Sequence, residues 1–128
     1  MQVDNRILIV DDEPAVLNVV AKMVERLGYR AVIALTGRDA LQLLAREDIE
    51  ILLLDVVLKD MTVVELANRS HSFFGRRRII FMSGHFPHLE INFPRTVPFL
   101  QKPFTLAQLK DAIDRSFSQS GDRAPEIG

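Results

Sequence analysis

Two stretches of aliphatic residues that each end in aspartate constrain the fold of this chain more than any other feature. The first is ILIVDD, from Ile7 to Asp12, and the second is ILLLD, from Ile51 to Asp55. An unbroken aliphatic run is typical of a parallel strand that is buried on both faces, with its polar residues at the carboxyl end. The two runs therefore predict two central strands that bring carboxylates to the same edge of one sheet.

The rest of the chain alternates predicted strands with predicted helices. Pro14 is tolerated in a first helical turn, so the first helix is expected from there toward Gly28. The other predicted strands span 29–35, 79–83 and 99–101, and the other predicted helices follow Thr36, span 63–72 and follow Thr105. Two of these helices have apolar residues that we expect to face the core. In the second helix they are Ala40, Leu41, Leu44 and Ala45. In the last helix they are Leu106, Leu109, Ala112, Ile113 and Phe117.

This alternation predicts a doubly wound α/β fold with a five-stranded parallel sheet in the flavodoxin-like order 2-1-3-4-5. Prolines 87, 94 and 98 interrupt the segment from His85 to Pro98, so we expect only a shortened or irregular fourth helix there. Ligands of such a sheet bind beyond strands one and three, where the winding direction reverses. Asp11, Asp12 and Asp55 are expected at that point.

The composition indicates one domain that recognises its partners locally. The chain has 128 residues, of which 48% are apolar, and we expect a domain over residues 1–118 and a polar tail over 119–128. A net charge of −1 gives no general attraction to nucleic acid or to an anionic membrane. No apolar run approaches the roughly 18 residues of a membrane span. Cysteine is absent, which excludes disulfides and thiolate metal sites and fits a cytoplasmic location.

Converging carboxylates need a counter-ion. Two carboxylates about 4 Å apart repel each other by roughly 4 kcal/mol at an effective dielectric constant of about 20. Mg²⁺ is a suitable counter-ion, since it prefers oxygen ligands and binds through one or two carboxylates and a phosphate. Each motif alone has a simpler explanation, because Asp11 and Asp12 could only cap a helix and Asp55 could only cap a turn. Ser83 and Lys102 are expected at the ends of strands four and five, and this convergence favours a functional site.

The motifs ILIVDDEPAV, ILLLDVVL, IIFMSG and FLQKPF resemble, in order and spacing, the receiver domain of two-component response regulators over about residues 6–118. The resemblance implies that Asp55 accepts a phosphoryl group from a histidine kinase or a histidine phosphotransfer protein. It implies that Mg²⁺ is bound by Asp11, Asp12, Asp55 and the backbone carbonyl of Val57.

The same resemblance gives roles to three further residues. It implies that Lys102 pairs with a phosphoryl oxygen, that the hydroxyl of Ser83 bonds the phosphoryl group, and that Phe99 turns inward as a switch. Such a domain is not an enzyme in the ordinary sense, because it catalyses only its own phosphorylation and slow dephosphorylation. Its output goes to a downstream protein that the sequence does not name.

The chain departs from the receiver pattern after Asp55. Receivers commonly have Pro four residues later and Asp-Gly seven and eight residues later, where this chain has Lys59, Thr62 and Val63. Val cannot easily adopt the positive φ that Gly permits, so we expect another path for this loop. The departure leaves open a pseudo-receiver that serves as an interaction module without phosphorylation. A phosphohydrolase is less favoured, because Val57 stands where such enzymes need an acid.

Overall fold

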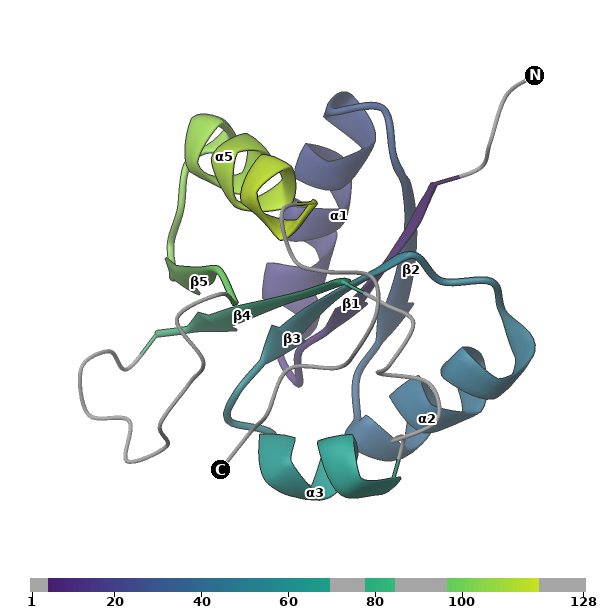
Figure 1. Ribbon diagram of the computed structural model, residues 1–128. Coiled ribbons are helices and arrows are strands. Elements are labelled where there is room, and N and C mark those ends of the chain that lie inside the picture. Colours follow the sequence, from purple (N-terminus) through teal and green to yellow (C-terminus); the bar gives the residue numbers. More distant parts are fainter. Residues whose placement is uncertain (1–4, 70–77, 85–96, 118–128) are drawn as a thin grey trace.

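The computed structural model of the protein describes residues 5–69, 78–84 and 97–117 (Figure 1). Along the chain its strands and helices are β1 (Arg6–Val10), α1 (Pro14–Arg26), β2 (Arg30–Ala34), α2 (Gly37–Arg46), β3 (Ile51–Asp55), α3 (Val63–Arg69), β4 (Arg78–Ser83), β5 (Phe99–Gln101) and α5 (Leu106–Ser116). The strands form one parallel sheet in the order β2-β1-β3-β4-β5, which confirms the predicted fold. The expected fourth helix between 85 and 96 and the tail from 119 lie outside the described residues.

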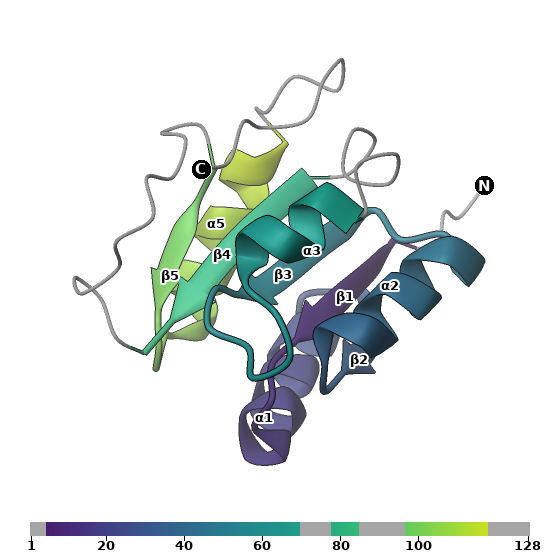
Figure 2. The ribbon, with the colours of Figure 1, turned by 90° about the horizontal axis from the view of Figure 1, so that it is seen from below.

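Helices cover both faces of the sheet, with α1 and α5 on one face and α2 and α3 on the other (Figures 1 and 2). The central strands β1 and β3 supply side chains to both layers in alternation. Ile7 and Leu53 pack in the layer of α1 and α5, whereas Leu8 and Leu52 pack in the layer of α2 and α3. These aliphatic runs are buried on both faces, as their sequence predicts.

The predicted starts of two helices are confirmed by their caps. The hydroxyl of Thr36 accepts a hydrogen bond from the backbone N–H of Asp39, at 3.0 Å, at the start of α2. At the start of α5, Thr105 and Gln108 form a reciprocal capping box, with N···O distances of 2.8 and 3.1 Å.

Two of the predicted core positions are wrong. Ala45 is exposed, because at about 100° per residue it lies roughly 120° around the helix from the centre of the Ala40–Leu44 stripe. Leu43 instead packs against the core. Phe117 comes after the end of α5 and is 41% exposed, with its ring 4.4 Å from the guanidinium carbon of Arg78. Among the helices described, none is long and apolar enough to cross a membrane.

Candidate functional site

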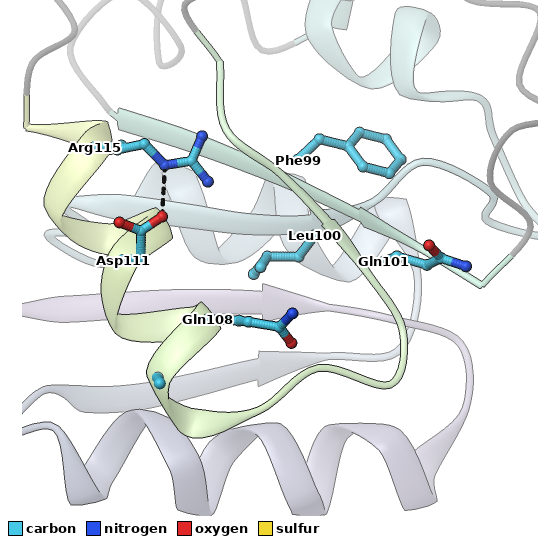
Figure 3. Close-up of a pocket in the computed structure, with 7 residues that line it drawn as sticks. Phe99, Leu100, Gln101, Gln108, Asp111 and Arg115 are labelled. Atoms are coloured by element: carbon cyan, nitrogen blue, oxygen red, sulfur yellow. Dashed lines mark hydrogen bonds and ion pairs between the residues drawn. The ribbon is translucent and has the colours of Figure 1, made fainter.

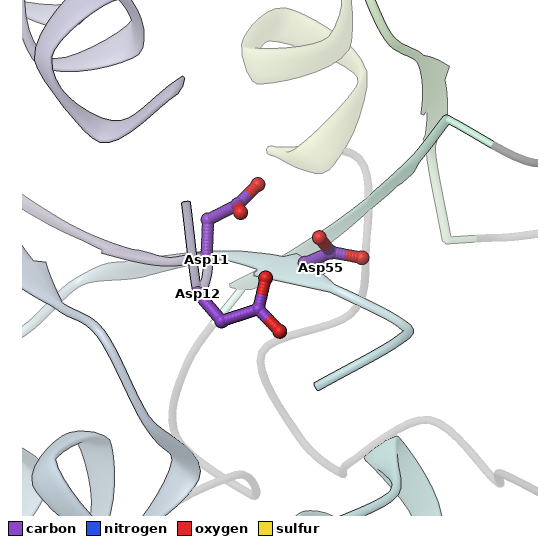
Figure 4. Close-up of side chains that lie close together, drawn as sticks. All are labelled: Asp11, Asp12 and Asp55. Atoms are coloured by element: carbon purple, nitrogen blue, oxygen red, sulfur yellow. The ribbon is translucent and has the colours of Figure 1, made fainter. Parts of the chain in front are cut away.

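The carboxylates of Asp11, Asp12 and Asp55 meet at the carboxyl edge of the sheet (Figure 4). Asp11 and Asp12 follow β1, and Asp55 is the last residue of β3, its parallel neighbour. One oxygen from each side chain lies within 4.8 Å of the other two. Asp11 is fully buried and Asp55 is 5% exposed, so two of the three charges have little solvation from water.

Lys102 supplies the positive charge of this cluster. It follows β5, and its backbone N–H donates to the carbonyl oxygen of Ser83 at 2.8 Å. Its Nζ lies 2.7 Å from Oδ2 of Asp11 and 2.8 Å from Oδ2 of Asp55. A single ammonium therefore bridges two buried carboxylates and offsets part of the charge that they carry.

The other oxygen of each buried carboxylate is held by the backbone. Oδ1 of Asp11 accepts from the N–H of Glu13 at 3.0 Å, and Oδ1 of Asp55 accepts from the N–H of Val57 at 2.9 Å. These bonds, together with the contacts of Lys102, fix the orientation of both carboxylates. The site is thus organised before any ligand arrives.

Burial raises the pKa of Asp55 to about 6, although hydrogen bonds from Lys102 and Val57 act to lower it. For Lys102, burial lowers the pKa, but the hydrogen bonds to Asp11 and Asp55 outweigh it and the net direction is upward. A paired acid and base usually shift in opposite directions, with the acid lowered. Here the pKa of the acid, Asp55, is raised as well. The ammonium of Lys102 is shared with Asp11, so it does not compensate for the burial of Asp55.

Ser83 and Phe99 lie at different places relative to the acids. Ser83 is the last residue of β4 and is fully buried, next in sequence to Met82, which pairs with Asp55. It therefore shares the edge with the acids and Lys102. Phe99 lies at the start of β5, half-buried, and packs against the layer of α2 and α3. It also borders a pocket between β5 and α5 (Figure 3).

The loop between β3 and α3 runs past the mouth of the site. Val57 is 52% exposed and forms an isolated antiparallel bridge with Thr62. Thr62 caps α3 through the N–H of Glu65, at 3.0 Å, and Val63 begins the helix. No described residue other than glycine has a positive φ, so this loop is built without the backbone conformation that Gly would supply. Asp60, which the sequence does not single out, binds the start of α2.

A groove of about 680 Å³ leads from the acids along α1. Its apolar side comes from Val16, Val19 and Met23 of α1 and from Phe104, and it reaches Asp12, Asp55, Lys59 and Lys102. Sequence reasoning missed this surface. Its one signal is the spacing of Ala15, Val19 and Met23, which recur every four residues on a side of α1 other than its buried stripe.

The protein thus combines a doubly wound parallel sheet with an acidic cluster at the point where the winding direction reverses. This combination is found in a known family of domains. The family model described as response regulator receiver domain matches residues 7–114, and the chain belongs to this family. The receiver protein CpdR of Brucella abortus is 31% identical over 86% of this chain and 94% of its own length. Sporulation initiation phosphotransferase F of Bacillus subtilis is 25% identical, with coverages of 88% and 93%.

Solved structures agree with this assignment. The receiver domain of the hybrid histidine kinase CckA superposes with a TM-score of 0.74 at 27% identity, covering 89% of this chain and all of that domain. Two transcriptional regulatory proteins are matched over only 55% and 28% of their length. Receiver domains act in two-component signalling and generally bind Mg²⁺ at an acidic pocket, and Asp11, Asp12 and Asp55 form such a cluster here.

Proposed function

We propose that this chain accepts a phosphoryl group on Asp55 from a histidine kinase or a histidine phosphotransfer protein, in two-component signal transduction. The observation that carries the proposal is the setting of Asp55, which is buried at the end of β3 beside two further carboxylates and the ammonium of Lys102. Residues 1–118 would form the receiver domain, and the family match over 7–114 supports this extent.

The donor set of the acidic cluster fits Mg²⁺. All three side chains offer hard carboxylate oxygens, which this ion prefers over nitrogen or sulfur. We propose Asp11, Asp12, Asp55 and the backbone carbonyl of Val57 as the residues that hold it. The bound ion would supply positive charge to the oxygens of the phosphoryl group during transfer.

The transfer itself uses Asp55 as a nucleophile. A carboxylate oxygen of Asp55 attacks the phosphorus, the bond from phosphorus to the histidine nitrogen breaks, and an acyl phosphate forms. Lys102 already donates to Oδ2 of Asp55, so its ammonium is within reach of a phosphoryl oxygen on that residue. Ser83 would donate its hydroxyl to the phosphoryl group, and Phe99 would report the change as the switch. Hydrolysis of the acyl phosphate by the domain itself would be slow.

The groove along α1 supports a protein donor. It opens at Asp55 and has an apolar side that includes Val19, which is 59% exposed, and Phe104. A helix that carries the phosphohistidine could bury its apolar face there. The balanced charge and the absence of cysteine fit a cytoplasmic exchange between proteins without direct binding to nucleic acid or membrane. Phosphotransfer profiling against the histidine kinases of the source organism would identify the donor.

Phosphorylation of one residue is the test. Incubation with acetyl phosphate and Mg²⁺, followed by mass spectrometry, should give a single labile adduct that is absent from Asp55→Asn. Asp48→Asn, which changes an exposed aspartate, is the matched control and should keep the adduct. An unmodified wild-type protein with every donor would instead favour the pseudo-receiver.

A further inference from the structure

We propose that Asp60 is a positioning residue for the phosphorylation site, because it ties the loop that carries Val57 to the start of α2. The inference rests on the proposed function, since it concerns the metal and phosphate chemistry of the same site. It extends that function to Asp60, whose side-chain hydrogen bonds among the described residues go to α2, a helix that carries none of the proposed site residues.

The tie consists of two hydrogen bonds to one carboxylate. The N–H of Gly37 donates to Oδ1 of Asp60 at 2.9 Å, and the N–H of Arg38 donates to Oδ2 at 3.0 Å. The first amides of a helix have no acceptor within the helix and carry partial positive charge. Both oxygens of Asp60 are thus used on a helix that begins more than 20 residues earlier in the chain.

Met61 makes a second link beside the first. Its side chain is 6% exposed and belongs to the core layer of α2 and α3. A Cβ atom at Gly37 would lie 2.5 Å from Cγ and 2.6 Å from Sδ of Met61, so the absence of a side chain at Gly37 permits this close approach. Gly37 therefore contacts the loop in two ways, since its N–H donates to Asp60 and Met61 packs where a side chain would otherwise lie.

The other end of the loop reaches Asp55. The N–H of Val57 donates to Oδ1 of Asp55 at 2.9 Å, and Val57 also bridges to Thr62. The loop sequence VVLKDMTV contains no Pro, so no proline ring fixes its backbone dihedral angles in advance. Contacts with the rest of the protein must restrict it. Between Val57 and α3 these contacts come from Leu58 and Met61, which are buried in the core, and from Asp60 through its bonds to α2.

The carboxylate of Asp60 is stabilised in its ionised form by the bonds that it accepts. Burial acts to raise the pKa of Asp60, but the N–H groups of Gly37 and Arg38 outweigh it and hold the pKa below its ordinary value. Asp60 is therefore ionised at the pH at which Asp55 changes its charge. The acceptor charge that holds Gly37 and Arg38 therefore persists at that pH.

The test compares Asp60→Ala with Thr36→Ala. Thr36 caps the same helix through Asp39 and has no hydrogen bond to the loop, so Thr36→Ala weakens α2 without cutting the tie. Asp60→Asn keeps one acceptor oxygen and should give an intermediate result. NMR of each protein without metal would measure the chemical shift and the hydrogen exchange of the Val57 amide, followed by a Mg²⁺ titration and the rate of phosphorylation by acetyl phosphate.

We expect Asp60→Ala to speed exchange at Val57 and to weaken Mg²⁺ binding by about tenfold, as is typical when a group that orients a ligand is lost. Thr36→Ala should leave both within about twofold of wild type, because it keeps the carboxylate of Asp60 and both of its bonds to α2. Equal behaviour of the two variants at Val57, or a wild-type Val57 amide in Asp60→Ala, would overturn the inference. A wild-type protein that takes neither Mg²⁺ nor phosphate would overturn the proposed function, while the Val57 amide without metal still decides the role of Asp60.

Discussion

The charge on Asp55 is set by a competition between its burial and its charged neighbours. Burial and the nearby Asp11 favour the neutral acid, and Lys102 favours the carboxylate. Because Lys102 also bonds Asp11, its ammonium satisfies neither acid alone. A pKa of about 6 follows, so in the absence of a ligand the site stores unfavourable charge at neutral pH. A cation or a phosphoryl group that replaces part of these contacts would relieve that charge.

This competition predicts how stability depends on pH. The pKa of Asp55 is 3.8 when unperturbed and about 6 in the folded protein, so between these values the folded state binds more protons than the unfolded state. Stability from this group therefore falls as the pH rises from about 4 to 6, and the loss stays constant above it. Asp55→Asn should be more stable than wild type by roughly 1 to 3 kcal/mol at pH 7.5 without metal, and nearly equal at pH 4.

Urea unfolding at both pH values, with Asp48→Asn as the exposed control, measures this difference. A less stable Asp55→Asn at pH 7.5 would mean that the ion pair with Lys102 outweighs burial. The direction of the pKa shift would then be wrong.

Lys102 should matter more for transmission than for acceptance of the phosphoryl group. Its loss leaves Asp55 and the acidic cluster in place, so Lys102→Ala should still accept phosphate from acetyl phosphate at a reduced rate. It removes the ammonium that joins the acids to the residue directly after β5, the strand that begins with Phe99. The phosphate mimic beryllofluoride should then fail to shift the NMR signals of Ser83 and Phe99.

Lys110→Ala is a suitable control for this experiment, because Lys110 is exposed on α5 and pairs only with Asp114 among the ion pairs of the described residues. Full shifts at Ser83 and Phe99 in Lys102→Ala would refute its role in transmission.

At the level of elements, the central strands could be predicted because burial on both faces favours aliphatic residues at every position. Strands β1 and β3 lie between two helical layers, so residues 7–10 and 51–54 are all aliphatic. The first polar residue after each run is Asp11, which follows β1, and Asp55, which ends β3. The edge strand β2 has one face less buried, and its sequence is correspondingly less distinct. It spans Arg30–Ala34 rather than the predicted 29–35. The acids and Lys102 could be predicted for the same reason, since parallel strands end at one edge.

The loop after β3 could not be predicted to the same degree. The sequence shows that Lys59, Thr62 and Val63 break the receiver pattern, but the contacts that replace the usual residues come from α2. Asp60 and Gly37 are 23 residues apart, and neither local propensity nor periodicity records a bond across that distance. The position of Ala45 shows a related limit, because helical periodicity defines a stripe but leaves its width to the residues that pack against it.

On the scale of the whole molecule, β3 joins the two layers into one cooperative unit. Leu52 faces the layer of α2 and α3, and Leu53 faces the layer of α1 and α5, and both side chains are fully buried. Each of the substitutions Leu52→Ala and Leu53→Ala should therefore lower the free energy of unfolding by roughly 2 to 5 kcal/mol, from lost burial and from the cavity left behind. Ile33→Ala, at a side chain that is 48% exposed on β2, should cost less than about 1 kcal/mol.

The chain offers a probe that can separate the two layers. Tyr29 is its one tyrosine, the chain has no tryptophan, and Tyr29 packs against the layer of α1 and α5. Urea unfolding followed by tyrosine fluorescence reports on that layer, whereas far-ultraviolet circular dichroism reports on helices in both. In a two-state domain the two signals coincide. Leu52→Ala alters the opposite layer, yet it should shift the fluorescence midpoint as far as the dichroism midpoint. A fluorescence midpoint that stays at the wild-type urea concentration would show that the layers unfold separately.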